Sequence, residues 1–235
     1  MPGRVKRIAA PGRWPVQRKT SYWAVKPSSG PHEEEFSMPL LSVVRDMLHL
    51  CNNSREAKLM INGGLFSVDG RVRKDYAFPV GIMDVVTVRG EEGGYRMSIN
   101  RRSKMHLVPI PQSECSWKIC RVEGKRILPG GKVQIALHDG RTLLSDVKVR
   151  TGDVIRLEVP EQKVLDVLPL RAGMKALVTG GSHVGEIATV SRFEKWRNPA
   201  PNLVYFSEGF STVWSNVFVA GTEDSVIKVP EVSAV

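Results

Sequence analysis

The sequence is poor in cysteine, and this excludes the small folds that disulfides or zinc ions hold together. Three of the 235 residues are cysteine, and no Cys-x-x-Cys pair occurs. No apolar run approaches the roughly 20 residues of a membrane-spanning helix. The basic N-terminus also lacks the apolar segment of a secretory signal. We therefore expect free thiols in a reducing, cytoplasmic compartment and no membrane partner.

Sequence signatures of catalysis are missing as well. Gly-x-Ser-x-Gly, His-Glu-x-x-His and a Cys/His zinc set are absent. Residues 180–185 have the glycine spacing of a phosphate-binding loop, but Glu186 and Ile187 stand where a lysine and a serine or threonine are required. The chain is therefore predicted not to be an enzyme and to use no cofactor, no metal and no small-molecule substrate.

Acidic residues are missing from the first thirty positions, which hold seven cations and so most of the chain's net charge of +10. Prolines are frequent here, and such a segment buries too little apolar area to fold alone. Trp14, Tyr22 and Trp23 lie between the cations, where they can stack on exposed bases or dock on the protein body. We interpret residues 1–38 as a basic extension that becomes ordered on RNA, rather than a solubilising tail. Its expected RNA contacts are Arg4, Lys6, Arg7, Arg13, Trp14, Arg18 and Lys19.

A short helix with one basic face is predicted to begin after Asn53. Asn53 can cap it, and Glu56 completes a capping box three residues later. Arg55 and Lys58 share one side because they lie three residues apart. Gly63 and Gly64 are expected to end the helix, since glycine adopts the left-handed C-terminal position without strain.

A tight hairpin at Asp69-Gly70 follows this helix, because this dipeptide favours two-residue turns. Arg71, Arg73 and Lys74 leave the turn as a second basic cluster. Separated cations on a small rigid unit suit the phosphates of folded RNA. Helix and hairpin together are predicted to form a binding surface, not a reaction centre.

The pattern beyond residue 90 is that of short strands divided by turns, which predicts a compact central β domain over residues 91–170. His138-Asp-Gly-Arg141 has the composition of a hairpin tip. Arg101, Arg102 and Lys104 form the densest basic patch of this region. That patch is either a solvated edge or a phosphate contact, and we favour the contact. The expected strands cover residues 105–110, 117–122, 133–137, 142–144, 154–159 and 164–168.

Residues 171–222 show further strands at 175–179, 186–190, 203–206 and 216–219, with a glycine loop at 180–185. This arrangement resembles the KOW motif, an SH3-like barrel of ribosomal proteins and elongation factors. The loop is not basic and residues 171–235 carry no net charge, so protein contact is expected here. His183 is interpreted as a loop-tip contact or surface residue, and residues 223–235 as a C-terminal tail.

Residues 39–90 resemble the S4-type RNA-binding module through Arg45-Asp46, Ser54-Arg55-x-Ala57, Val68-Asp-Gly70 and Gly81 to Asp84 before an apolar strand. With the basic extension, the central β domain and the KOW motif, this order of parts resembles the archaeal and eukaryotic small-subunit ribosomal protein family S4e, and its archaeal form in particular. The resemblance implies an α+β multidomain protein: a small α/β S4-type module, a central β domain and a C-terminal SH3-like barrel.

The resemblance further implies a structural component of the ribosome that binds small-subunit ribosomal RNA and neighbouring ribosomal proteins. Two alternatives from other classes of protein remain open from the sequence. One is a KOW-containing translation or transcription factor. The other is an RNA-modification enzyme with an S4-type domain, for which residues 91–235 are short and rich in strands.

Overall fold

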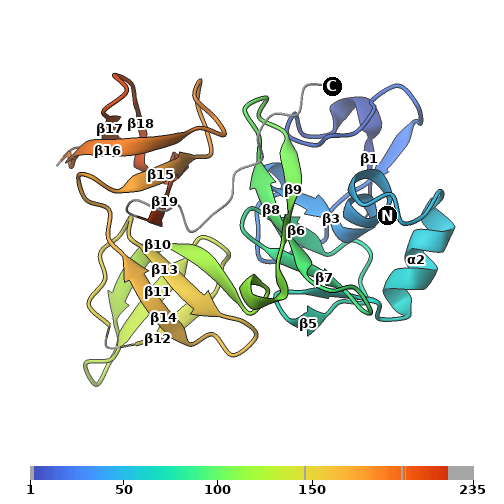
Figure 1. The fold of residues 1–235 in the computed structure, drawn as a ribbon, viewed down its shortest axis with the longest axis horizontal. Coiled ribbons are helices and arrows are strands. Elements are labelled where there is room, and N and C mark those ends of the chain that lie inside the picture. The colour runs from blue at the N-terminus through green and yellow to red at the C-terminus, as the bar shows by residue number, and fades with distance from the viewer. Residues whose placement is uncertain (1–2, 146, 197, 199, 222–235) are drawn as a thin grey trace. The chain divides into compact units, whose positions relative to one another are not determined.

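A computed structural model describes residues 3–145, 147–196, 198 and 200–221; the C-terminal tail expected at 223–235 lies outside them. The described chain forms two compact units (Figure 1). The first contains the residues up to Ser98, Lys104–Lys118 and Glu158–Glu161. The second contains Ile99–Ser103, Ile119–Leu157 and the residues from Gln162 onwards.

The first unit is built on a five-stranded sheet of order β5-β4-β7-β8-β9. Two smaller ladders, β1-β2 and β3-β6, accompany it. Its strands are β1 (Arg4–Lys6), β2 (Trp23–Val25), β3 (Ser37–Pro39), β4 (Phe66–Val68), β5 (Arg71–Val72), β6 (Pro79–Gly81), β7 (Val85–Val88), β8 (Gly94–Ile99) and β9 (Met105–Ile110). Its helices are α1 (Leu40–Ser42), which continues into a π-helical turn at Val43–Met47, and α2 (Ser54–Asn62).

The core of the first unit joins the helices, the sheet and the N-terminal segment. Leu41 and Val44 from the first helical segment, Ile61 from α2 and Phe66 from β4 are all fully buried in it. Trp14 is buried in the same cluster. The N-terminal segment therefore packs on this unit in the absence of RNA through Trp14, whereas residues 1–38 were expected to become ordered only on RNA.

The second unit contains two five-stranded antiparallel sheets. The first has the order β12-β11-β10-β13-β14 and is formed by β10 (Trp117–Ile127), β11 (Val133–Leu137), β12 (Thr142–Leu144), β13 (Val154–Glu158) and β14 (Val164–Leu168). The second has the order β18-β17-β16-β15-β19 and is formed by β15 (Lys175–Val178), β16 (Ile187–Glu194), β17 (Leu203–Phe206), β18 (Ser211–Val213) and β19 (Val217–Gly221). Each sheet has its own apolar cluster.

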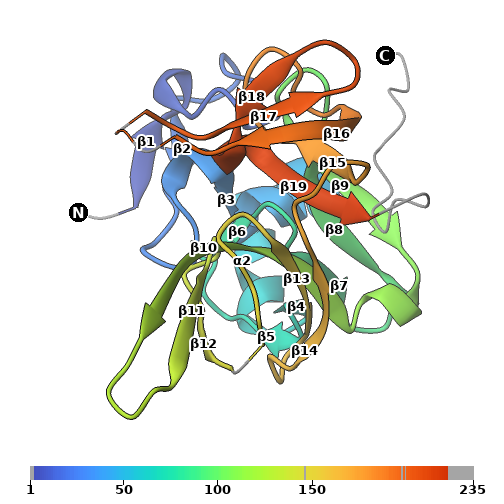
Figure 2. The same ribbon diagram turned by 90° about the vertical axis from the view of Figure 1, so that its left-hand side faces the viewer.

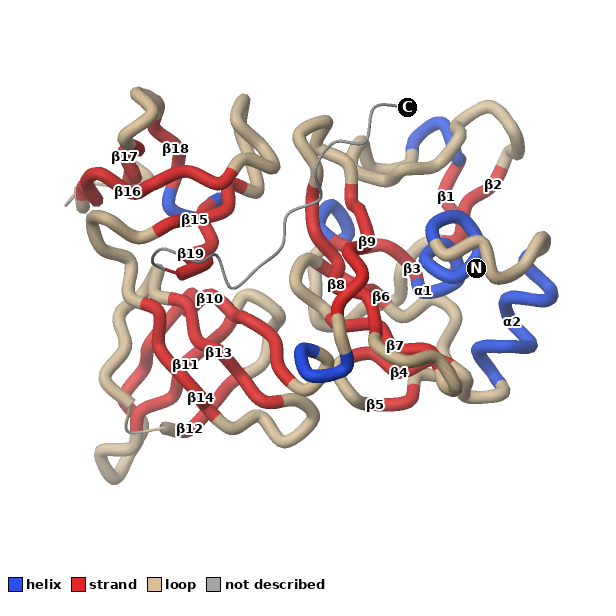
Figure 3. The backbone as a smooth tube through the Cα atoms, viewed as in Figure 1, coloured by secondary structure: helices blue, strands red, loops and turns tan. Residues whose placement is uncertain are grey.

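Strands dominate and helices are few (Figure 3). The expected strands of residues 105–168 are all present, although β10 is longer than predicted. Strand β8 was not expected, and it joins β9 to the sheet of the first unit rather than to the central β domain. In the sheet of residues 175–221, β18 and β19 occupy opposite edges, and the pairings of the described residues do not close it into the expected barrel. Among the described residues, the helices are all too short to span a bilayer.

Candidate nucleic-acid interface

Helix α2 begins at the predicted cap. The Asn53 Oδ1 atom accepts hydrogen bonds from the backbone N–H groups of Arg55 and Glu56, both at 2.9 Å. The Glu56 carboxylate in turn accepts from the Asn52 N–H at 3.0 Å and from the Asn53 side-chain amide at 2.8 Å. These bonds satisfy donors that a helix start leaves unpaired, and they fix the position of Arg55 in the first turn.

The two faces of α2 are separated as the spacing predicts. Ala57 and Ile61 are fully buried, whereas Arg55 is exposed to solvent. The Lys58 ammonium lies 4.0 Å from the centre of the Tyr76 ring. A cation over an aromatic face is attracted by the ring's electron density. Lys58 is therefore held in place, while Arg55 remains available to a partner.

The hairpin between β4 and β5 has the predicted two-residue turn, since Asp69 and Gly70 have φ angles of 51° and 70°. Arg71 and Lys74 are exposed. Arg73 is half-buried, and its guanidinium lies 4.3 Å from the Phe78 ring centre. Of the three predicted hairpin cations, Arg71 and Lys74 present their charge to solvent most directly.

A network of buried charged side chains fixes this hairpin to the rest of the first unit. The Lys118 ammonium donates to Asp69 at 2.8 Å and to Asp84 at 2.9 Å, and all three side chains are almost completely buried. Asp84 also contacts His32 Nε2 at 2.9 Å and accepts from the Gly81 N–H. Burial acts to raise the pKa of Asp84, but His32 and Lys118 outweigh it and hold that pKa below its usual value. The turn residue Asp69 is thus fixed by a lysine that lies 49 residues away in the sequence.

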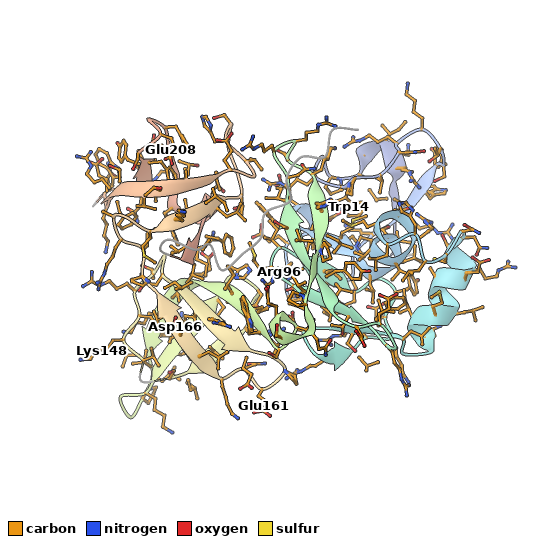
Figure 4. The ribbon with its side chains drawn as sticks, in the orientation of Figure 1. Trp14, Arg96, Lys148, Glu161, Asp166 and Glu208 are labelled. Atoms are coloured by element: carbon orange, nitrogen blue, oxygen red, sulfur yellow. The ribbon has the colours of Figure 1, made fainter. Side chains whose placement is uncertain are left out.

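Two N-terminal residues predicted to contact RNA are instead parts of the protein's own fold. Trp14, labelled in Figure 4, is fully buried, and its indole N–H donates to the Ser37 carbonyl at 2.7 Å. Its ring therefore has no free face on which a base could stack. Arg7 is 8% exposed and donates to the Gln17 carbonyl and the Ser21 hydroxyl. Arg7 and Trp14 thus make internal contacts that order this segment, which is rich in cations and prolines.

Three further predicted cations also make contacts within the protein. The Arg13 guanidinium lies 4.2 Å from the Phe36 ring centre, and burial lowers its pKa against the opposing effect of Glu35. Arg18 is exposed but donates to the Ile8 carbonyl at 2.9 Å. Lys104 donates to the Gly12 carbonyl and so ties β9 to the N-terminal segment. These cations can still face a partner, but part of their bonding capacity is used.

The remaining predicted cations are exposed. Arg4 and Lys6 lie on β1, with Lys19 in the loop before β2, while Arg101 and Arg102 lie in the turn between β8 and β9. Tyr22 and Trp23, beside β1, have exposed fractions of 64% and 48%. The choice that the sequence left open is therefore resolved differently for the two tryptophans. Trp14 docks on the protein body, and Trp23 keeps half of its surface in solvent.

A groove of about 810 Å³ brings the N-terminal ladder and α2 together. Arg4 and Trp23 line one part of it, and Lys58, Tyr76 and Arg45 line another. Arg45 forms a two-point ion pair with Asp46, both contacts at 2.8 Å, and this hydrogen bonding raises the pKa of Arg45. We call these five residues the groove residues. Arg45 and Tyr76 were not among the predicted contacts, although Arg45 belongs to a motif that carried the family resemblance.

A second cluster, in the other unit, has the composition of a metal site. Ligand atoms of Cys120, His138 and Asp139 lie within 4.8 Å of one another. Asp139, however, is paired with Arg141 at 3.3 Å, and His138 Nδ1 accepts from the Arg121 N–H at 3.2 Å. Since the Asp139 carboxylate and the His138 Nδ1 atom already make contacts within the protein, the cluster is explained as part of the hairpin structure at residues 138–141.

Comparison with known proteins identifies the family of each region. Residues 4–35 match the RS4NT (NUC023) domain, residues 38–86 the S4 domain and residues 91–164 the ribosomal family S4e.

Full-length relatives agree with these matches. The small ribosomal subunit protein eS4 of Methanothermobacter thermautotrophicus is 42% identical, covering 96% of this chain and 95% of the relative. The protein of the same name from Ignicoccus hospitalis is 43% identical, covering 97% and 94%. The crystal structure of the 30S ribosomal protein S4e from Thermoplasma acidophilum aligns with a TM-score of 0.71 and 37% identity, covering 80% of this chain and 96% of that one. The chain therefore belongs to the S4e family of ribosomal proteins.

Proposed function

We propose that the protein is a structural constituent of the small ribosomal subunit and binds its ribosomal RNA through the groove residues together with Arg55 and Arg71. The observation that carries the proposal is the groove itself, where cations from β1 and α2 lie beside the half-exposed Trp23. Cations neutralise phosphates, and an exposed indole provides a stacking face for an unpaired base.

The chemistry of this surface favours binding over catalysis. Its charged groups are arginines and lysines, and Asp46, the acid beside the groove, is fully engaged by Arg45. A general acid or base requires a titrating group within hydrogen-bond reach of a substrate. Positioning a folded RNA requires separated cations and stacking faces, and the groove supplies both.

For residues 171–221 we propose an SH3-like fold of the KOW type with a role in protein contact. In support, β15 to β18 form an antiparallel meander, and the last strand along the chain, β19, pairs with the first, β15. A single 3₁₀ turn at Trp214–Asn216 precedes β19. The glycine loop 180–185 carries His183, which stacks on Phe210 at 4.0 Å and contacts Glu186. An aromatic pair next to a carboxylate fits a protein neighbour better than a phosphate.

This proposal places the protein in the ribosome, in the cytoplasm, with ribosomal RNA and adjacent ribosomal proteins as partners and without a small-molecule substrate. A permanent component stays with the small subunit during sedimentation through a high-salt sucrose cushion. A translation or transcription factor would wash off, and that result would replace the proposal with the factor alternative.

The RNA surface is tested with a pair of substitutions, Arg4→Gln and Lys58→Gln, in one protein. The control protein carries Arg171→Gln and Lys195→Gln, which remove one exposed arginine and one exposed lysine from residues 171–221. Each lost phosphate contact should reduce the slope of log K against log salt by about 0.7–0.9. Equal slopes for both proteins, at unchanged melting temperature, would contradict the assignment of the groove.

A further inference from the structure

The hairpin of β10 and β11 extends beyond the part of its sheet that packs on the core. Residues 117–122 of β10 are buried, whereas residues 123–127 are mostly exposed. The ladder nevertheless continues beyond a register shift between Val122 and Gly124, with Lys125 opposite Ile135, Arg126 opposite Gln134 and Ile127 opposite Val133. Figure 2 shows this hairpin projecting past β12. We call residues 124–133 the hairpin tip.

The turn of the hairpin tip is well defined. The Leu128 N–H donates to the Lys132 carbonyl at 2.8 Å, and the Gly131 N–H donates to the Leu128 carbonyl. Gly130 and Gly131 both adopt the left-handed region, with φ angles of 83° and 75°. A Cβ atom on either glycine would meet open space, so these glycines serve the turn geometry and not a packing contact.

The hairpin tip buries little and exposes apolar surface. Ile127 is 73% exposed, which is unfavourable in water for a β-branched side chain in an ordered strand. A two-stranded ribbon without a packed face adds little to stability by itself. The extension therefore does not serve the core of its own unit, and a partner is the physical reason for keeping it.

The charge of the hairpin tip identifies the partner. Residues 124–138 contain Lys125, Arg126 and Lys132 and no acid. Both flanking acids are already neutralised: Glu123 is bound by Arg121, and the buried Asp139 is paired with Arg141. The three cations are exposed and have no ion-pair partner among the residues that the structure describes. Their positive field is therefore uncompensated.

Successive residues of a strand point to opposite faces, so Lys125 and Arg126 present charge on both sides of the ribbon. A cationic ribbon charged on both faces suits insertion between two phosphate-bearing segments rather than docking on one flat surface. Lysine is depleted at the cores of protein–protein interfaces, and neutralising phosphates is its usual role at nucleic acids.

We propose that the hairpin tip is a second RNA-binding element of this protein, which inserts between segments of folded RNA. The inference rests on the proposed function for the identity of the RNA, but it concerns a different unit and different residues. Lys125, Arg126 and Lys132 contact phosphates, and Ile127 lies against sugar or base edges near the apex.

The test is a protein with Arg126→Gln and Lys132→Gln, compared with the control pair Arg171→Gln and Lys195→Gln. Both proteins lose one exposed arginine and one exposed lysine, so the change of net charge is the same. Affinity for naked small-subunit RNA is measured over a range of salt concentrations, and hydroxyl-radical footprints are recorded. We expect the slope of log K against log salt to fall by about 1.4–1.8 in the hairpin protein, with loss of one footprint and retention of the others.

The possible outcomes are distinct. If the native chain itself fails to bind the RNA, the proposed function fails. If the native chain binds and the hairpin protein matches the control in slope and footprint, the second element is refuted and the proposed function stands. If RNA binding is unchanged but incorporation into subunits that contain their proteins is weakened, the partner of the hairpin tip is a protein, and the proposal is overturned. Melting temperatures should agree among all three proteins, because the substituted side chains are exposed.

Discussion

Replacing Trp14 by alanine should strongly destabilise the first unit. The side chain is completely buried, and its indole N–H is bonded to the Ser37 carbonyl at 2.7 Å. Removing a buried tryptophan leaves a cavity that costs about 3–5 kcal/mol of unfolding free energy. A domain's whole stability is about 5–15 kcal/mol, so a large share is lost. At about 2–4 °C per kcal/mol, the melting temperature should fall by about 10 °C.

The N-terminal segment itself provides the matched control. Trp23→Ala removes the same side chain from a position that is 48% exposed, so its effect on stability should be much smaller. Trp14→Phe keeps most of the packing but leaves the Ser37 carbonyl without its donor, which should cost about 1–3 kcal/mol. RNA affinity should respond in the opposite order, because stacking on Trp23 contributes about 1–3 kcal/mol per base.

Urea denaturation monitored by far-ultraviolet circular dichroism measures the first effect, and titration with small-subunit RNA measures the second. Equal unfolding free energies for Trp14→Ala and Trp23→Ala would refute the docking of the N-terminal segment. A Trp23→Ala protein that binds RNA as tightly as the native chain would refute the stacking role.

Three further predictions concern the buried charge network and its surroundings. Lys118→Met should lower the unfolding free energy by about 3–5 kcal/mol, because the buried Asp69 and Asp84 lose the ammonium that bridges them. Lys148→Met, at an exposed site, should leave the unfolding free energy nearly unchanged in the same urea denaturation. The pKa of Asp84 is lower in the folded protein than its unfolded value of 3.8, so its ionised carboxylate stabilises the fold fully above that value, and this stabilisation is lost as pH falls through the folded value. The free energy of unfolding should therefore decrease with pH below about pH 4, and less steeply in Asp84→Asn. Equal pH slopes in the two proteins would contradict this. Gly81→Ala would place a Cβ atom on the His32 ring, so calorimetry should show a clear fall in melting temperature, while Gly12→Ala, where the Cβ meets open space, should change it little.

Features governed by short-range rules were predictable from the sequence. The cap of α2 and the Asp69-Gly70 turn depend on residues within a few positions of one another, and the structure confirms both. Gly64 ends the helix in the left-handed region with a φ angle of 74°, while Gly63 remains helical. The strands of residues 105–168 were recognisable because turn residues bound each apolar stretch.

Features that depend on distant partners were not predictable. Trp14 meets Ser37 across 23 positions, and only that contact distinguishes a docked tryptophan from an exposed one. Strand β8 was missed because Arg96 lies in its middle. The structure buries this arginine over the Trp117 ring at 4.3 Å and beside Glu114. The basic hairpin tip had a usable signal, the acid-free stretch of residues 124–138, but its cations do not form a continuous run.

Strand β10 contributes residues to both units, and this determines when the first unit can fold during synthesis. Lys118, near the start of that strand, closes the charge network of the first unit, and Glu158–Glu161 also belong to this unit. A nascent chain that ends at residue 98 carries Asp69 and Asp84 without Lys118, whose ammonium bridges the two carboxylates. The first unit therefore cannot be completed during synthesis until about 160 residues have left the ribosome. A fragment that ends at residue 98 should be less stable than the same residues in the whole protein, although it contains β1 to β7 complete.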